Sequence, residues 1–245
     1  MVIGDRFVWA HMPKTGGDST HELFRILNPS IDIDSIRQAA KHHTFTQREK
    51  TTKLDLTHAR RRIMNIRRLP TWLLSHAKHR ERNNGYPVEQ DLLREGRFRQ
   101  VHNVTRAHRV ARLATAPAIL IPGRTRRILK RHVIRWLTKP GESLSADLFL
   151  TRMMCGRVDH WIRVEHLADD FLHVLSQFEK VSDEQKREIL ALPPQNTGDY
   201  PRELDRWFDR DALAQVYETN PVWMGIERQV YGAALIDLDV TRRAA

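Results

Sequence analysis

The chain has 245 residues, 40% of them hydrophobic, and carries a formal net charge of +11 at pH 7. This length and composition predict a globular fold with one well-buried core and exclude a chain that is disordered throughout. The single cysteine, Cys155, excludes an internal disulfide and a cysteine-based metal motif, which is compatible with a reducing compartment.

No apolar stretch approaches the length of a membrane span, and the first residues lack the apolar core of a signal peptide. We therefore expect a cytoplasmic protein without stable membrane insertion. The excess of Lys and Arg favours an anionic partner, which could be a nucleic acid, a nucleotide with phosphates at two positions, or an acidic acceptor. Charge alone does not choose among these.

The first predicted element is a strand over residues 7–10 (FVWA), followed by a turn over 13–17 (PKTGG). Residues 18–20 (DST) then open a helical pattern that continues to Ile26. Glycines let backbone amides approach an anion closely, a helix N-terminus adds unpaired N–H groups, and Lys14 supplies a full positive charge. A strand, a glycine turn and a helix in this order predict an anion-binding loop.

The middle of the chain begins with residues 46–49 (TQRE), a capping box that predicts a short helix. Residues 61–67 (RRIMNIR) predict a second strand with basic residues at its carboxyl end. Pro70 occupies a favoured first position of a helix that runs toward 83–85 (NNG), a natural stop. From 88 to 137 the chain is basic and mostly helical in pattern.

A third strand is predicted over residues 159–164 (DHWIRV), after a helix over 144–154. The remaining predicted helices cover residues 165–178, a segment capped at 182–185, 211–218 and 221–231. Strands separated by helices predict an α/β fold, rich in helix, with a small central parallel sheet flanked by helices.

We expect one domain over residues 1–245, with a basic helical insertion at about 88–140. Within it, residues 124–135 fit an amphipathic surface helix or, alternatively, a rim for an acidic acceptor. Ligands of parallel α/β sheets bind at the carboxyl ends of the strands. Both the PKTGG turn and the arginines after the second strand belong to such ends.

The glycine turn differs from a Walker loop, in which the lysine follows the glycines, because Lys14 precedes Gly16 and Gly17. It resembles the 5′-phosphosulfate-binding loop of the sulfotransferase family, whose members commonly carry PKTGGTS or PKTGTT after the first strand. Asp18 stands where threonine is usual. The resemblance implies a P-loop-NTPase-like sulfotransferase fold. The donor-binding residues that it implies here are Pro13, Lys14, Thr15, Gly16, Gly17, Asp18, Ser19 and Thr20.

The sulfotransferase family has a second signature, in which an arginine ends a strand, a serine follows eight residues later, and the two hold the 3′-phosphate. Arg67 and Ser75 keep this spacing, but Pro70 follows Arg67 by three positions where two is usual. Whether Arg68 is a second contact therefore stays open. A guanidinium binds phosphate through a charge-assisted fork, and a hydroxyl adds a neutral donor. The later PPQNTGDY stretch resembles the family's loop near the adenosine, which implies a contact from Asn196.

The resemblance implies transfer of a sulfuryl group from 3′-phosphoadenosine 5′-phosphosulfate to a hydroxyl or amine of an acceptor such as a glycan, a lipid or a natural product. The product of the donor is 3′-phosphoadenosine 5′-phosphate. Lys14 would neutralise charge on the bridging oxygen, while the loop amides with Thr15, Ser19 and Thr20 hold the 5′-phosphate. This is electrostatic stabilisation with positioning, and its logic requires no metal.

An acceptor hydroxyl also needs a base near neutral pH. His43 is preferred, because KHHTF at 41–45 resembles the family's KHxT pattern, with His42 as the alternative and Glu22 as a carboxylate substitute. His11 is expected to pack at the strand end. The histidines form no HExxH, and no CxxC is present, so we expect no metal site.

Two other classes of protein stay open. One is a P-loop-type nucleotide kinase or phosphotransferase, which a magnesium requirement for nucleotide binding would favour. The other is a nucleic-acid-binding protein that uses the basic central region. Binding to DNA or RNA that weakens with salt and survives Lys14→Ala would favour it.

Overall fold

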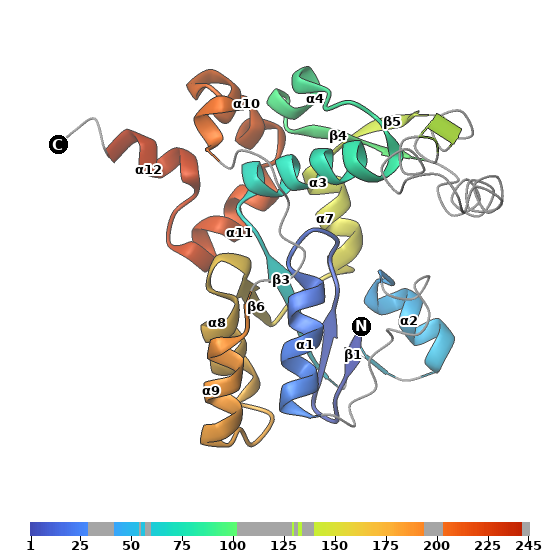
Figure 1. Ribbon diagram of the computed structural model, residues 1–245, viewed down its shortest axis with the longest axis vertical. Helices are drawn as coiled ribbons and strands as arrows, with labels where there is room; N and C mark the ends of the chain where they lie inside the picture. The colour runs from blue at the N-terminus through green and yellow to red at the C-terminus, as the bar shows by residue number, and fades with distance from the viewer. Residues whose placement is uncertain are drawn as a thin grey trace. The chain divides into compact units, whose positions relative to one another are not determined.

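The computed structural model describes residues 1–28, 42–53, 55–56, 60–101, 129, 132–133, 140–193 and 203–241. Within these ranges the fold is α/β and rich in helix (Figure 1). The elements through β5 are β1 (Val2–Ile3), β2 (Phe7–Ala10), α1 (Gly17–Leu27), α2 (Phe45–Thr52), β3 (Arg61–Ile66), α3 (Leu69–Asn84), α4 (Gln90–Arg94), β4 (Arg97–Val101) and β5 (Pro140–Ser145). Those after β5 are α7 (Ala146–Met154), β6 (His160–Arg163), η2 (Val164–His166), α8 (Leu167–Leu175), α9 (Asp183–Ala191), η3 (Leu204–Arg206), α10 (Arg210–Thr219), α11 (Pro221–Tyr231) and α12 (Leu235–Thr241).

The main sheet has four strands in the order β1-β2-β3-β6. β2, β3 and β6 are parallel, with Trp9 opposite Ile63 and Met64 opposite Trp161, whereas β1 adds an antiparallel edge. This confirms the small parallel sheet and the three strands predicted from the sequence. Because the three parallel strands run the same way, the segments that follow them meet at one edge of the sheet.

The contacts of the chain group into two compact units. The first comprises Met1–Arg68, Leu148–Thr197 and Gly225–Ala245, and the second comprises Leu69–Asp147 and Gly198–Met224. The expected single domain over 1–245 stays a prediction.

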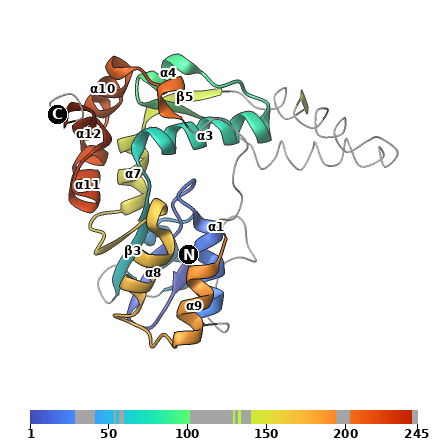
Figure 2. The same cartoon turned by 60° about the vertical axis from the view of Figure 1, so that its left-hand side comes forward.

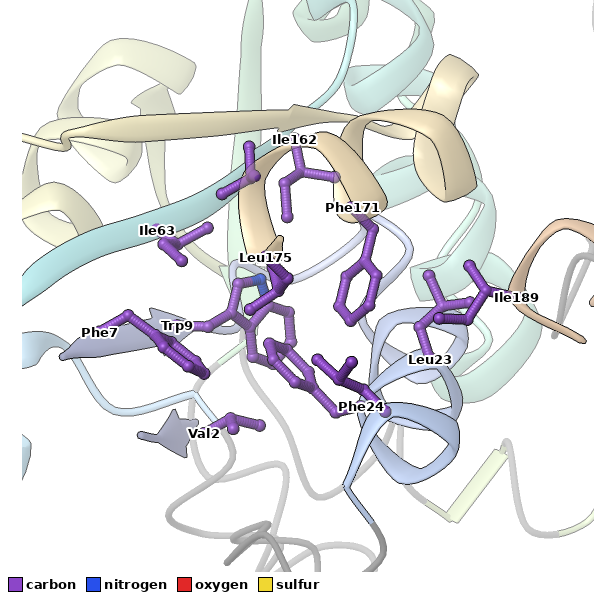
Figure 3. Close-up of a cluster of buried hydrophobic side chains, with 12 residues drawn as sticks. Val2, Phe7, Trp9, Leu23, Phe24, Ile63, Ile162, Phe171, Leu175 and Ile189 are labelled. Carbon is purple, nitrogen blue, oxygen red and sulfur yellow. The ribbon is translucent and has the colours of Figure 1, made fainter. Parts of the chain in front are cut away.

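The core of the first unit lies between the four-stranded sheet and the helices α1, α8 and α9, which pack beside one another (Figures 1 and 2). Figure 3 shows the buried side chains, with Trp9 of β2 close to Phe24 of α1. Phe24 also meets Phe171 of α8 edge to face, with ring centroids 4.9 Å apart. Each such buried side chain contributes about 1.5–3 kcal/mol, so this packing fixes α1 on the sheet.

The second unit contains α3, α4, α10 and a two-stranded antiparallel sheet of β4 and β5. Its core includes Trp72, whose ring centroid is 4.9 Å from that of Trp223 and 5.2 Å from that of Phe98. The mostly helical pattern predicted from 88 to 137 is therefore wrong at β4. The helix predicted from residue 144 begins only at Ala146, because Leu144 and Ser145 belong to β5. Each strand is stabilised by a partner some forty residues away, which local periodicity does not reveal.

The predicted cap is confirmed at the start of α9 and corrected at the starts of α2 and α3, where Pro70 is the second helical residue and not the first. Ser182 and Gln185 form the predicted capping box at the start of α9. At α2 the box is formed by Thr44 and Gln47, two residues before the predicted Thr46, because Thr44 has the extended backbone of an N-cap. None of the helices in the described part of the chain combines the length and apolar character needed to cross a membrane.

Candidate functional site

The segment between β2 and α1 turns sharply into the helix. Lys14 and Gly16 both have left-handed backbones, with φ of 68° and 71°. For lysine this conformation costs about 1–3 kcal/mol and persists only where the surroundings impose it. Thr15 lies between them and donates its hydroxyl hydrogen to the carbonyl of Met12 at 2.7 Å. The predicted glycine turn is thus a tight loop with a left-handed backbone at Lys14 and Gly16.

The N-terminus of α1 has no side-chain cap. Its N-cap residue is Gly16, whose carbonyl accepts a hydrogen bond from the Thr20 amide at 3.0 Å. The amides of a first helical turn have no partner within the helix, and the helix dipole adds partial positive charge there. The start of α1 therefore combines a glycine N-cap with the positive end of the helix dipole, although Asp18 in the first turn opposes an anion in part.

Gly17 is required by the close approach of His11. A Cβ atom at position 17 would lie 1.8 Å from His11 Nε2. The His11 side chain is buried and stacks on Trp9, with ring centroids 5.6 Å apart. It meets His21 edge to face at 5.4 Å. His11 therefore packs at the strand end, as the sequence predicted.

Asn65 of β3 connects the strands to this loop, and sequence reasoning missed it. It is fully buried, and its Nδ2 donates to the Thr15 carbonyl at 2.8 Å and to Thr20 Oγ1 at 2.7 Å. Its Oδ1 accepts from Trp9 Nε1 at 2.8 Å. The available signal was a polar amide among the apolar residues of RRIMNIR.

Arg67 and Arg68 follow β3, and the structure gives Arg68 a buried ion pair. Arg68 Nη1 lies 3.2 Å from the fully buried Glu227 carboxylate, and the guanidinium lies 4.0 Å from the centre of the Tyr231 ring. Removing one partner of a buried ion pair typically costs about 3–5 kcal/mol of folding stability. Arg68 is therefore held by structural partners, and Arg67 beside it is half-buried.

Tyr231 connects the Arg68–Glu227 ion pair to the segment after β6. Its hydroxyl donates to Glu165 at 2.5 Å and lies 3.3 Å from the carbonyl of Ile66 at the end of β3. Burial, together with the Glu165 carboxylate, raises the pKa of Tyr231 above its ordinary value. The hydroxyl therefore stays a hydrogen-bond donor, and it holds the ends of β3 and β6 together.

Arg163, the last residue of β6, is held by Asp170 of α8. Two hydrogen bonds of 2.7 Å join the guanidinium to the carboxylate, and the Arg163 amide donates to the same side chain at 2.8 Å. Burial alone would raise the pKa of Asp170, but the hydrogen bonds from Arg163 outweigh it and lower that pKa. Arg163 is therefore occupied by a structural partner.

The three predicted bases have different surroundings. His42 lies beside the loop, and its Nδ1 is 3.4 Å from the His11 carbonyl oxygen. The ring centroids of His42 and His11 are 4.6 Å apart. His43 is half-buried, and its Nδ1 has no hydrogen-bond partner in the described part of the chain. Glu22 lies on α1 and forms an ion pair with Arg25. The structure thus brings His42 to the end of β2.

The other predicted site residues divide between the loop and the rest of the chain. Pro13 and Asp18 are half-buried in the loop and the first helical turn, and Ser19 is buried beside them. Ser75 is a buried residue of α3 in the second unit, and Asn196 lies outside the described residues. Among the residues with described positions, no group of three or more His, Cys, Asp and Glu side chains could hold a metal ion.

No protein-family model, curated protein or solved structure matches this chain.

Proposed function

We propose that this protein is a sulfotransferase that uses 3′-phosphoadenosine 5′-phosphosulfate as donor. The observation that carries the proposal is the left-handed loop at Lys14–Gly16, which leads from a parallel strand into a helix with an uncapped N-terminus. Such a loop presents backbone N–H groups and a lysine to an anion. Its sequence is the one that resembles the family's 5′-phosphosulfate loop.

A second basic segment lies close to this loop. Asn65 hydrogen bonds directly to Thr15 at 2.8 Å, and Arg67 is two residues after Asn65 while Lys14 is one residue before Thr15. Consecutive Cα atoms are about 3.8 Å apart, so the backbones of Lys14 and Arg67 belong to neighbouring segments. This supports one adenosine ligand whose 5′ and 3′ phosphates meet different basic residues. The contacts expected from Ser75 and Asn196 rest on the motifs alone.

In the proposed reaction an acceptor oxygen forms a bond to sulfur while the bond from sulfur to the 5′-phosphate oxygen breaks. Lys14 and the amides of Gly16 and Gly17 stabilise the charge that develops on the departing phosphate. The acceptor proton passes to His43 or His42. The nucleotide leaves as 3′-phosphoadenosine 5′-phosphate, and the sulfated acceptor carries the transferred group.

The test is isothermal titration calorimetry of the whole chain with 3′-phosphoadenosine 5′-phosphate and with ATP, each with and without magnesium. We expect saturable binding of the first nucleotide that does not need magnesium and that ATP does not match. Binding of ATP that requires magnesium would instead indicate a kinase or phosphotransferase, and no binding of either nucleotide would overturn the proposal.

The net charge of +11 also favours a nucleic-acid-binding protein as the second candidate. A short single-stranded DNA, titrated at several salt concentrations, separates the two candidates. Tight DNA binding that weakens with salt and is unchanged by Lys14→Ala would favour this candidate, because that affinity would come from the distributed charge.

A further inference from the structure

We infer that Asn65 is a positioning residue that sets the orientation of the backbone amides in the anion loop. The inference rests on the proposed function for its ligand, but the geometry of the loop carries it. Asn65 is fully buried, and it acts through Thr15 and Thr20.

The amide of Asn65 is fully committed to three neighbours. Both of its N–H groups are donated, one to the Thr15 carbonyl and one to Thr20 Oγ1, while its oxygen accepts from Trp9. Thr15, Thr20 and Asn65 are all completely buried. A buried donor or acceptor that loses its partner is costly, so this network tolerates one arrangement of the loop.

The arrangement of the Thr15 carbonyl decides where the next amide points. In a planar trans peptide the C=O and the following N–H point in opposite directions. Because the Thr15 carbonyl faces Asn65 in the interior, the N–H of Gly16 faces away from β3. Asn65 thereby aims one amide of the proposed anion site.

Thr20 fixes the orientation of the next peptide, between Gly16 and Gly17. Its hydroxyl accepts from Asn65 and donates to the Gly16 carbonyl at 3.1 Å, and its backbone amide bonds to that carbonyl as well. With the Gly16 carbonyl held along the helix, the N–H of Gly17 points out of the helix N-terminus. The Thr20 hydroxyl, predicted as a phosphate contact, therefore acts as a relay in this arrangement.

The test substitutes Asn65→Asp, which keeps the shape but cannot provide both N–H donors in either protonation state. The chain offers a matched control in Asn220, which is also fully buried. Its Nδ2 donates to the Gly96 and Val216 carbonyls at 2.9 and 2.8 Å, and its Oδ1 accepts from the Asp147 amide. Asn220→Asp removes the same kind of hydrogen bonds in the second unit.

We expect both variants to unfold at lower temperature, and only Asn65→Asp to weaken binding of 3′-phosphoadenosine 5′-phosphate, by roughly tenfold or more, since small misplacements of binding groups have large effects. In the ligand-free protein, the amide NMR signals of Gly16 and Gly17 should shift in Asn65→Asp and not in Asn220→Asp. Unchanged Gly16 and Gly17 signals in Asn65→Asp would overturn the inference, and so would equal losses of affinity in the two variants.

Thr20→Val provides a second variant in case Asn65→Asp does not fold. It keeps Asn65 and removes only the relay, so the Gly17 amide signal should shift more than the Gly16 signal; no shift of either would overturn the inference. If the wild-type chain does not bind the nucleotide, the proposed function fails, while the amide signals still decide the role of Asn65.

Discussion

The two adjacent glycines of the loop are needed for different reasons. Gly16 has a left-handed backbone, which glycine adopts without steric cost, whereas Gly17 leaves room for the His11 ring. The sequence pattern GG shows neither reason, since both depend on the φ angle and the neighbour at each position.

We predict that Gly17→Ala destabilises the protein by about 1–3 kcal/mol, because its Cβ would overlap the buried His11 ring and force it to move. The measurement is the free energy of unfolding from urea denaturation. Gly225→Ala is the control, because Gly225 lies inside α11 and a Cβ there would meet nothing within 4 Å. Gly225→Ala should stabilise the protein by about 0.5–1 kcal/mol. Equal effects of both changes would contradict the predicted contact.

Lys14 and Arg67 should affect catalysis in different ways. Lys14→Ala is expected to lower the rate of transfer about 100- to 1,000-fold with a smaller effect on nucleotide affinity, because it removes charge stabilisation of the transition state. Arg67→Ala should mainly weaken binding of 3′-phosphoadenosine 5′-phosphate, by about 10- to 100-fold, as for loss of a charged hydrogen bond. The measurements are nucleotide calorimetry and release of the nucleotide from the phosphosulfate donor with a phenol as surrogate acceptor. Full activity of either variant would contradict the assignment.

At the scale of the elements, one glutamine holds the ends of two helices. The Gln185 oxygen accepts from the Ser182 amide at the start of α9, and its Nε2 donates to the carbonyls of Ile26 and Leu27 at the end of α1. Gln47 has the same capping role at the start of α2, where its side-chain oxygen accepts from the Thr44 amide. The two capping boxes have the same local sequence pattern but different tertiary contacts.

We predict that Gln185→Ala lowers the free energy of unfolding by about 1.5–4.5 kcal/mol, since the ends of both helices together lose three hydrogen bonds worth about 0.5–1.5 kcal/mol each. Gln47→Ala, the matched control, should cost less than about 1 kcal/mol because it removes one cap interaction. Chemical denaturation of the two variants checks the difference. An equal cost would mean that the bonds from Gln185 to α1 contribute nothing.

The three parallel strands were predictable from short apolar runs with glycine, proline or charged residues at their ends. The strands β4 and β5 were not, because RFRQV and PGESLS contain few apolar residues and, within the described part of the chain, form a two-stranded sheet with each other. Phe98 packs against Trp72 of α3, which supplies the apolar contact that the strand sequences lack. Residues 97–101 and 140–145 therefore form strands because they pair with each other and because Phe98 packs on α3, and not because of their local sequence.

At the scale of the whole molecule, the formal net charge is +11 at pH 7, and it becomes more positive as the pH falls. Protonation of the carboxylates that form native ion pairs adds to this self-repulsion. Asp170 is the clearest such group at the site, because hydrogen bonds from Arg163 hold its pKa below the ordinary value of 3.8.

We predict that Asp170→Asn lowers the free energy of unfolding by about 2 kcal/mol near pH 7, as for loss of a charged hydrogen bond. The lowered pKa means that the contribution of Asp170 is present above its ordinary value of 3.8 and is lost as the pH falls through the folded value. The difference between wild type and variant should therefore shrink in acid. Urea denaturation at pH 7 and at about pH 3 checks this. A difference that stays constant with pH would contradict it.

The sequence by itself determined the features that depend on near neighbours. These are the α/β class, the strands predicted over 7–10, 61–67 and 159–164, whose observed bounds differ by at most one residue at each end, the glycine turn with Lys14, and the caps of several helices. Each follows from the side-chain period or from turn and cap preferences within a few residues. The donor and the reaction were expected from motifs and stay proposals.

Only the tertiary structure decided which polar groups serve the loop and which are occupied elsewhere. It gave Asn65 its bonds to Thr15 and Thr20, and it paired Arg68 with Glu227, 159 positions away in the sequence. Sequence patterns could not give these assignments, because a polar side chain in a strand or a pair of arginines fits many partners. The choice among them is made when folding removes the chain from water and every buried donor and charge must find a partner.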